Sequence, residues 1–470
     1  MRLPKQPKQR PEGPADEGVQ ATGMRDRGAQ LGQAQGAEKR EKPSGDPDHE
    51  HQTRPVHRSR DLRRHEEDSG ADDGADDQHD RVPDAQGPKQ VAFGLVEARE
   101  FTHWSATEIS NNARVDGTAL VLCEGAFGTV NGKTAHGLVR GTNRYRILGV
   151  IDPPTAGKDA GEVLDGVSRG IPAFASLGQA LGRLTPKPDF AIVGIATSGG
   201  RFTPELKASA REALKKGLSV VNGLHEFLSD DPESSELASR NGARLIDVRK
   251  VPSTSQLHFW TGEISGLATP RIAVLGTDCA IGKRTTTRLA VEACARAGIR
   301  AEWVSTGQTG WMQGAPFGIL LDALPNDFVS GELEHAILSC ARELEPEVIF
   351  LEGQSSLRNP SGPCGSEFIV SGGARSVILQ HAPGRTYFEG WEREELRIPP
   401  VAEEIELIGL LGASVVALAL HHEGLGPDAL QAERARLERD LSIPVVLPLE
   451  EGVERLVPVV REIIRKEPAS

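Results

Sequence analysis

Short, continuous runs of apolar residues recur along the chain from about residue 91 onward. Residues 119–123, 147–151 and 190–196 form such runs in the first half, and residues 272–275 form one in the second half. Runs without alternating polar positions are typical of strands that are buried on both faces of a sheet. Amphipathic stretches with helical spacing, such as residues 204–217, lie between them. The alternation of the two patterns predicts βαβ units and open parallel sheets.

Composition and pattern together divide the chain into four parts. The first ninety residues contain no Ile, Phe, Trp, Tyr or Cys, so they hold too little apolar surface to offset the entropy of folding. We therefore predict an α/β fold, in which a Rossmann-like parallel-sheet domain is followed by a P-loop three-layer α/β domain. The predicted boundaries are 1–90 for a disordered tail, 91–250 for the Rossmann-like domain, 251–270 for an interdomain connection and 271–470 for the P-loop domain.

Residues 271–298 predict a strand, a glycine-bounded loop and a helix, in that order. A loop that ends at a helix N-terminus presents free backbone N–H groups and the positive end of the helix dipole, which suits a phosphate. Lys283 adds a positive charge at the same place. The contacts predicted for a phosphate-bearing cofactor are Gly276, Thr277, Cys279, Ala280, Ile281, Gly282, Lys283, Arg284 and Thr285.

This loop departs from the usual phosphate-loop pattern in two ways. It is one residue longer between its glycines, and Arg284 stands directly after Lys283, where Ser or Thr is expected. The hydroxyl that holds Mg²⁺ in nucleotide hydrolases is displaced to Thr285. The departure favours an additional anionic contact over Mg-ATP. The alternative is a tight turn with an incidental lysine.

Three titratable residues follow strands near this loop or lie within it, and they are the candidate catalytic residues Asp278, Glu352 and His381. Glu352 ends an apolar run, which favours a general base or a metal ligand over a solvated carboxylate. Asp278 lies within the loop as a candidate base, with a helix N-cap as the alternative role. His381 has an ordinary pKa suited to proton transfer near neutral pH.

Polar and basic residues at neighbouring strand ends are candidates for substrate binding. Two lie in the segment directly after a predicted strand at 301–304, and two directly follow the Glu-Gly pair at 352–353. Two arginines further along would suit a dicarboxylate such as glutamate, because a guanidinium binds a carboxylate through a planar fork. Either arginine is alternatively a surface charge. The candidates are Gln308, Thr309, Gln354, Ser355, Arg358 and Arg385.

An alternative cofactor follows from the first half of the chain. Asp152 ends the predicted strand at 147–151, where an acidic residue commonly binds a ribose hydroxyl of NAD. The preceding glycine-rich loop, residues 124–134, lacks the G-x-G-x-x-G pattern of dinucleotide-binding proteins. NAD therefore stays a minor alternative.

Charge and cysteine usage narrow the class of protein. The net charge of −13 argues against a nucleic-acid surface, and no apolar run approaches the ~20 residues that cross a membrane. The five cysteines are scattered without metal-ligand spacing, which favours the reducing cytoplasm and no bound metal. His421 and His422 follow a predicted strand, where adjacent side chains point to opposite faces, so we do not expect a shared metal there.

Several longer motifs resemble one known family. VIDPPTAGKDAG, GIATSGG and NGLHEFLSDD precede GTDCAIGKRTTT, STGQTG, LEGQSSL and LQHAPGR. This arrangement resembles a family long described only as a domain of unknown function, which pairs a Rossmann-like domain with a P-loop domain like that of dethiobiotin synthetase. The resemblance covers the chain from about residue 119 to the C-terminus.

One branch of that family consists of D-glutamate N-acetyltransferases. The resemblance implies an enzyme that moves acetyl from acetyl-CoA to the amine of D-glutamate or a similar amino acid. We expect a homo-oligomer that acts on this small molecule and binds neither nucleic acid nor membrane. The alternatives are an ATP-dependent, Mg-requiring ligase or kinase-like enzyme, and an NAD-dependent epimerase-like or dehydrogenase-like or nucleotide-binding regulatory protein.

Overall fold

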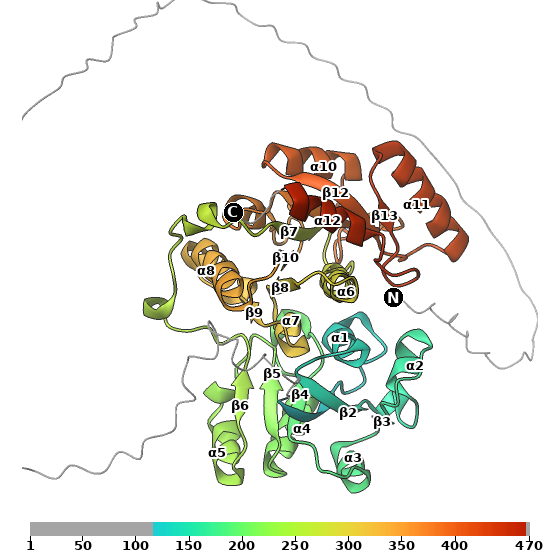
Figure 1. Ribbon diagram of the computed structural model, residues 1–470. Coiled ribbons are helices and arrows are strands. Elements are labelled where there is room, and N and C mark those ends of the chain that lie inside the picture. The colour runs from blue at the N-terminus through green and yellow to red at the C-terminus, as the bar shows by residue number, and fades with distance from the viewer. Residues whose placement is uncertain (1–115, 467–470) are drawn as a thin grey trace, which may run out of the picture. The chain divides into compact units, whose positions relative to one another are not determined.

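The computed structural model describes residues 116–466 (Figure 1), and the predicted disordered tail at 1–90 lies outside these residues. Within this range the chain forms a six-stranded sheet followed by a seven-stranded sheet. Every pair of neighbouring strands in both sheets is parallel. The predicted fold class, a Rossmann-like domain followed by a P-loop α/β domain, is confirmed.

The first sheet has the strand order β3-β2-β1-β4-β5-β6, which is the doubly wound order of a Rossmann fold. Helix α1 packs against α2, whereas α4 packs against both α3 and α5, as right-handed crossovers on the two faces require. The strands are β1 (Gly117–Leu122), β2 (Tyr145–Ile151), β3 (Ala173–Phe174), β4 (Phe190–Val193), β5 (Ser219–Asn222) and β6 (Leu245–Asp247). The helices are α1 (Lys133–Arg140), α2 (Ala160–Asp165), α3 (Leu177–Arg183), α4 (Pro204–Lys215) and α5 (Pro232–Asn241).

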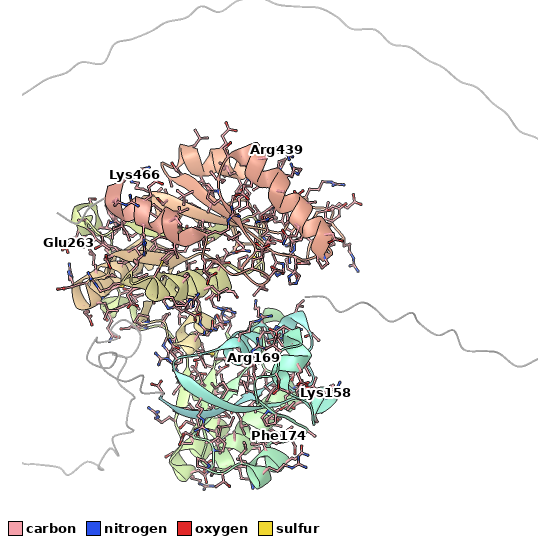
Figure 2. The ribbon with its side chains drawn as sticks, turned by 45° about the vertical axis from the view of Figure 1, so that its right-hand side comes forward. Lys158, Arg169, Phe174, Glu263, Arg439 and Lys466 are labelled. Atoms are coloured by element: carbon pink, nitrogen blue, oxygen red, sulfur yellow. The ribbon has the colours of Figure 1, made fainter. Side chains whose placement is uncertain are left out.

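The second sheet has the strand order β13-β12-β11-β7-β10-β8-β9. The strands are β7 (Arg271–Gly276), β8 (Ala301–Ser305), β9 (Phe317–Gly318), β10 (Val348–Glu352), β11 (Ser376–His381), β12 (Ser414–Leu420) and β13 (Val445–Val446). The helices are α6 (Lys283–Arg296), α7 (Gln308–Gln313), α8 (Asn326–Leu344), α9 (Ser366–Val370), α10 (Val401–Leu410), α11 (Pro427–Leu441) and α12 (Leu456–Lys466). Arg439 on α11 and Lys466 at the end of α12 are labelled in Figure 2.

The central strand β7 shows why the apolar runs lack alternation. Ala273 and Leu275 belong to the core on one face of the sheet, together with residues of α8 and α11. Ile272 and Val274 belong to the core on the other face, together with residues of α6 and α12. Alternate residues of a strand point to opposite faces, so a strand covered by helices on both sides needs apolar residues throughout.

The elements that the pattern did not predict are short or lie at sheet edges. Strands β3 and β9 each have two residues, which is too few to show a period, and Phe174 of β3 is labelled in Figure 2. Helix α7 has six residues and begins three residues after β8 ends. Gln308 and Thr309 therefore open a helix, and the expectation that they end the preceding strand is wrong.

The segment that joins the two sheets, residues 251–270, is bound to α8 through two buried carboxylates. Glu332 accepts hydrogen bonds from the backbone N–H and the ring of His258, and Glu334 accepts from the backbone N–H groups of Thr261 and Ile264. A buried carboxylate with several N–H donors is well compensated for its loss of water. These bonds fix the course of the chain into β7, the strand that leads to the glycine-bounded loop.

Candidate functional site

The glycine-bounded loop joins β7 to α6 at the carboxyl end of the second sheet. Gly282 is the N-cap of α6 and has a φ of +105°, a conformation that glycine adopts without strain. Ala280 also has a positive φ, of +55°, which is uncommon for a residue with a side chain. The cap of α6 makes no side-chain hydrogen bond. The first N–H groups of α6 therefore face a loop without a capping side chain, as an anion site requires.

Lys283 ties this loop to the segment that follows β10. Its Nζ donates to the carbonyl of Asp278 at 2.6 Å and to the carbonyl of Ser355 at 2.7 Å. The side chain is buried, and burial lowers its pKa. An ammonium has three N–H donors, so these two bonds leave one donor for a ligand.

Asp278 is fully buried and holds the loop in place. Its carboxylate accepts hydrogen bonds from Arg385 Nη1 at 2.8 Å, from Asn359 Nδ2 at 2.9 Å and from the backbone N–H of Glu389 at 2.8 Å. The alternative role as the N-cap of α6 is wrong, because Gly282 occupies that position. Both carboxylate oxygens face donors of the chain itself, which leaves Asp278 poorly placed to accept a proton from a substrate.

Glu352 ends β10 and differs from Asp278 in its surroundings. The side chain is only 6% exposed, and its Oε2 has no hydrogen-bond partner among residues 116–466. Burial raises the pKa of Glu352 to about 7, although the guanidinium of Arg284 acts in the opposite direction. Arg284 is itself without a partner at its buried Nε within the same residues. A carboxyl group with a free oxygen and a pKa near neutrality suits general-base catalysis.

Two histidines at this edge, His381 and His421, have lowered pKa values. Burial lowers the pKa of His381 to about 4, and its Nδ1 lies 3.0 Å from the Thr277 hydroxyl. Burial also lowers the pKa of His421 to about 4. The rings of His421 and His422 stack with their centroids 5.1 Å apart, so the expectation that they point to opposite faces is wrong. Both residues lie beyond the end of β12, where the alternation of a strand no longer applies.

The predicted substrate residues after β8 connect the two sheets. Thr309 is buried, and its hydroxyl lies 3.0 Å from that of Thr134 at the start of α1. The side-chain oxygen of Gln308 accepts from Arg249 Nη2 at 2.9 Å. Both side chains therefore join the Rossmann-like part to the P-loop part.

The other predicted substrate residues already have partners in the chain. Gln354 donates to the carbonyl of Thr306, and the Ser355 hydroxyl accepts a weak bond from the Cys279 thiol at 3.4 Å. Arg358 pairs with Glu403 at 2.9 Å and with Glu404 at 2.6 Å. Arg385 pairs with Asp278, Glu389 and Glu423. Binding of substrate by these residues stays a prediction.

Asp152, like Asp278, is a buried carboxylate whose two oxygens both accept hydrogen bonds from the chain itself. It is fully buried, and its Oδ1 accepts from the backbone N–H groups of Gly125 at 2.8 Å and Phe127 at 3.1 Å. Its Oδ2 accepts from the Thr155 hydroxyl at 2.7 Å. The carboxylate thus shapes the loop after β1, and this arrangement speaks against a contact to a ribose hydroxyl.

Two functional candidates have little or no sequence signal. Asn359, which holds Asp278, lies in a loop with no recognisable motif. Lys133 follows Gly132 in a glycine-rich loop that matches no complete phosphate-binding pattern, although its Gly-Lys-Thr triplet resembles part of a phosphate loop.

Two surface hollows of about 460 Å³ and about 360 Å³ are lined by other residues, including Asp189 and Arg244 in the first and Glu263 and Leu338 in the second.

The fold and the loop together define a two-domain α/β protein with a glycine-bounded loop between β7 and α6 of its second domain. A family model described as a P-loop domain of unknown function, DUF1611_C, matches residues 258–457. A second model, described as the Rossmann-like domain DUF1611_N, matches residues 153–251. The chain belongs to the DUF1611 family. Within residues 116–466, no helix is both long enough and apolar enough to cross a membrane.

Relatives and a solved structure agree with this assignment. A protein of Tritonibacter scottomollicae named D-glutamate N-acetyltransferase is 31% identical over 57% of this chain and 79% of its own length. A Pseudoalteromonas protein of the same name is 28% identical over the same shares. The crystal structure of a DUF1611 family protein from Anabaena variabilis is 29% identical with a TM-score of 0.67, and the match covers 74% of this chain and 99% of that one.

Proposed function

We propose that this protein transfers the acetyl group of acetyl-CoA to the amine of D-glutamate or a similar amino acid. The names of the two relatives support this activity. The proposal depends on two neighbouring features. Glu352 is a buried carboxyl group with one oxygen that has no partner among residues 116–466. In the glycine-bounded loop nearby, Arg284 stands where the metal-binding hydroxyl is expected. This combination provides a base and a phosphate handle without a metal-binding group at the usual position.

The residues around the loop fit a phosphate-bearing co-substrate. Gly282 leaves the helix end open, Lys283 keeps one N–H free, and the Nε of Arg284 has no partner among the described residues. Gly282 and Lys283 would hold the phosphates of coenzyme A, and Arg284 would contact a further anionic group. Acetyl-CoA supplies an acetyl group that is activated as a thioester.

Glu352 is the residue we assign as general base. An ammonium cannot attack a carbonyl, so the acceptor amine must first lose a proton, and Glu352 Oε2 is free to take it. The amine nitrogen then bonds to the acetyl carbonyl carbon and releases a second proton to solvent, while the carbon–sulfur bond breaks. Glu352 returns the proton to the departing thiolate, so the products are the N-acetyl amino acid and free thiol.

An ATP-dependent ligase is the second candidate, because Glu352 stands at the strand end where P-loop enzymes place an acidic metal ligand. The position of Arg284 favours the acetyltransferase.

All five cysteines are free thiols, which agrees with the reducing cytoplasm that we propose as the compartment.

A thiol-release assay separates the two candidates. We expect the protein to release free thiol from acetyl-CoA in the presence of D-glutamate, and to keep most of this rate in excess EDTA. Formation of ADP from ATP with the same amino acid is measured in parallel. In a ligase, Mg²⁺ neutralises the phosphates during transfer, so EDTA abolishes turnover. Absence of thiol release together with EDTA-sensitive ADP formation contradicts the acetyltransferase and supports the ligase.

A further inference from the structure

Two arginine side chains of α6 reach α1 of the Rossmann-like domain and the residue that follows it. A Cβ atom on Gly137 would lie 3.0 Å from Nη2 of Arg284, so the guanidinium reaches the surface of α1 at this glycine. One turn further along each helix, Arg288 donates to the carbonyl of Gly141. Gly137 and Gly141 are four residues apart, and so are Arg284 and Arg288. The contacts therefore follow one face of α1 and one face of α6.

Lys133 lies on the face of α1 that Arg284 approaches, because it is four residues before Gly137 in the same helix. The surroundings of Lys133 agree with this placement, because burial and the charge of Arg284 lower its pKa while Cys279 acts in the opposite direction. Thr134, the next residue, touches Thr309 of α7.

The ammonium of Lys133 makes no hydrogen bond or ion pair with residues 116–466. The carboxylate of Asp322 raises the pKa of Lys133, but it already forms an ion pair with Arg249 at 2.7 Å. The free ammonium and the Arg284 guanidinium therefore form a site of excess positive charge next to Glu352. A free ammonium near a guanidinium whose Nε has no hydrogen-bond partner among residues 116–466 indicates a site for an anionic group of a ligand.

We propose that Lys133 and Arg284 bind the side-chain carboxylate of the acidic acceptor, so that the Rossmann-like domain selects the amino acid. The proposal rests on the proposed function. It places the acceptor between Glu352, which receives the proton of the amine, and the cationic pair, which binds the far end of the molecule. An acidic acceptor then gains a charge-assisted contact that a neutral amino acid of the same size lacks.

The test replaces Lys133 by Gln, which keeps the length of the side chain and removes its charge. Lys158→Gln is the matched control, because Lys158 is exposed on the same domain and is labelled in Figure 2. We expect Lys133→Gln to raise the KM for D-glutamate roughly tenfold to hundredfold, the range for a charged hydrogen bond, and to change the KM for acetyl-CoA less than twofold. The KM for D-glutamine should change little, and Lys133→Arg should recover most of the affinity.

Two outcomes overturn the proposal. An unchanged KM for D-glutamate in Lys133→Gln removes the lysine from the acceptor site. A raised KM for acetyl-CoA that disappears with 3′-dephospho-acetyl-CoA assigns the lysine to the cofactor phosphate instead.

A binding titration separates this proposal from the activity itself. Glutarate carries two carboxylates and no amine, so it tests the site without any transfer. Glutarate binding that is lost in Lys133→Gln supports the site even if the wild-type protein transfers no acetyl group. Acetyl transfer that Lys133→Gln leaves unchanged supports the activity and contradicts the site.

Discussion

A Cβ atom on Gly310 would lie 2.5 Å from Oε2 of Glu352, so the carboxyl group fits only because residue 310 is glycine. The same atom would lie 2.5 Å from Cβ of Ser305 in β8. Contacts below 3.0 Å are not tolerated by carbon atoms, and Ser305 cannot turn away because its Cβ is fixed to the backbone. Helix α7 thus sets both the burial and the position of the candidate base.

We expect Gly310→Ala to destabilise the fold by about 1–3 kcal/mol, the range for overpacking a buried site, and to lower activity. Thermal unfolding measures the first effect. Gly409→Ala in α10 is the control, because nothing lies within 4 Å of a Cβ there and alanine stabilises a helix by roughly 0.5–1 kcal/mol relative to glycine. Equal melting temperatures for the two variants would contradict the steric argument.

The pH dependence of activity tests Glu352 directly. Its pKa is about 7, so the fraction that can accept a proton rises as the pH increases through 7, and kcat/KM should rise with it. Glu352→Gln should remove this rise and lower kcat by roughly 10²–10⁴-fold.

Glu302 offers a matched control for that experiment. Burial raises its pKa to about 7 as well, but it lies near the start of β8, where it pairs with Ile349 near the start of β10. The start of a parallel strand faces the opposite edge of the sheet from Glu352. Glu302→Gln should therefore keep the pH profile, and loss of the rise in this variant instead would show that the profile reports a different group.

Most strands of both sheets could be predicted from sequence because burial on two faces demands apolar residues at every position, whereas β3 and β9, with two residues each, could not. The loop and its helix could be predicted because glycine, lysine and helix N-terminus are adjacent in the chain. The roles of Asp278 and Arg385 could not, because they are 107 positions apart and their contact exists only after folding. Similarly, the pKa of Glu352 depends on its burial in the folded chain, which the sequence does not reveal.

The raised pKa of Glu352 also predicts how stability changes with pH. The folded protein keeps the proton up to about pH 7, whereas the unfolded chain loses it near 4.5. Between these values the folded state binds more protons, so the free energy of unfolding falls as the pH rises. The difference corresponds to roughly 3 kcal/mol at pH 8.

Glu352→Gln has no proton to lose, so it should gain stability relative to the wild type as the pH increases from 5 to 8. Thermal unfolding of both proteins at several pH values measures the change. A difference in melting temperature that stays constant over this range would show that the pKa of the folded carboxyl is not raised. The two experiments together distinguish a buried carboxyl group from a catalytic one. A carboxyl group that is only buried changes the pH dependence of stability, whereas a catalytic base also changes the pH dependence of kcat/KM.

Asp152 provides the last test, which concerns the loop after β1. Three donors of the chain converge on its buried carboxylate, from Gly125, Phe127 and Thr155. In Asp152→Asn the backbone N–H groups of Gly125 and Phe127 lose a charged acceptor, and the amide nitrogen can no longer accept from the Thr155 hydroxyl, so we expect a loss of about 1–3 kcal/mol in the free energy of unfolding. Asp165→Asn is the control, because Asp165 forms exposed pairs with Arg140 and Arg169 that are worth about 0–1 kcal/mol.

The same variant decides between a structural carboxylate and a ribose ligand. A ligand that binds the native state raises the melting temperature, so NAD should leave the wild-type value unchanged if Asp152 serves the loop alone. Stabilisation of the wild type by NAD that is lost in Asp152→Asn would restore the dinucleotide interpretation. We expect acetyl-CoA to raise the melting temperature of the wild type and of Asp152→Asn by the same amount, because we assign the phosphates to the P-loop domain and not to the loop at Asp152.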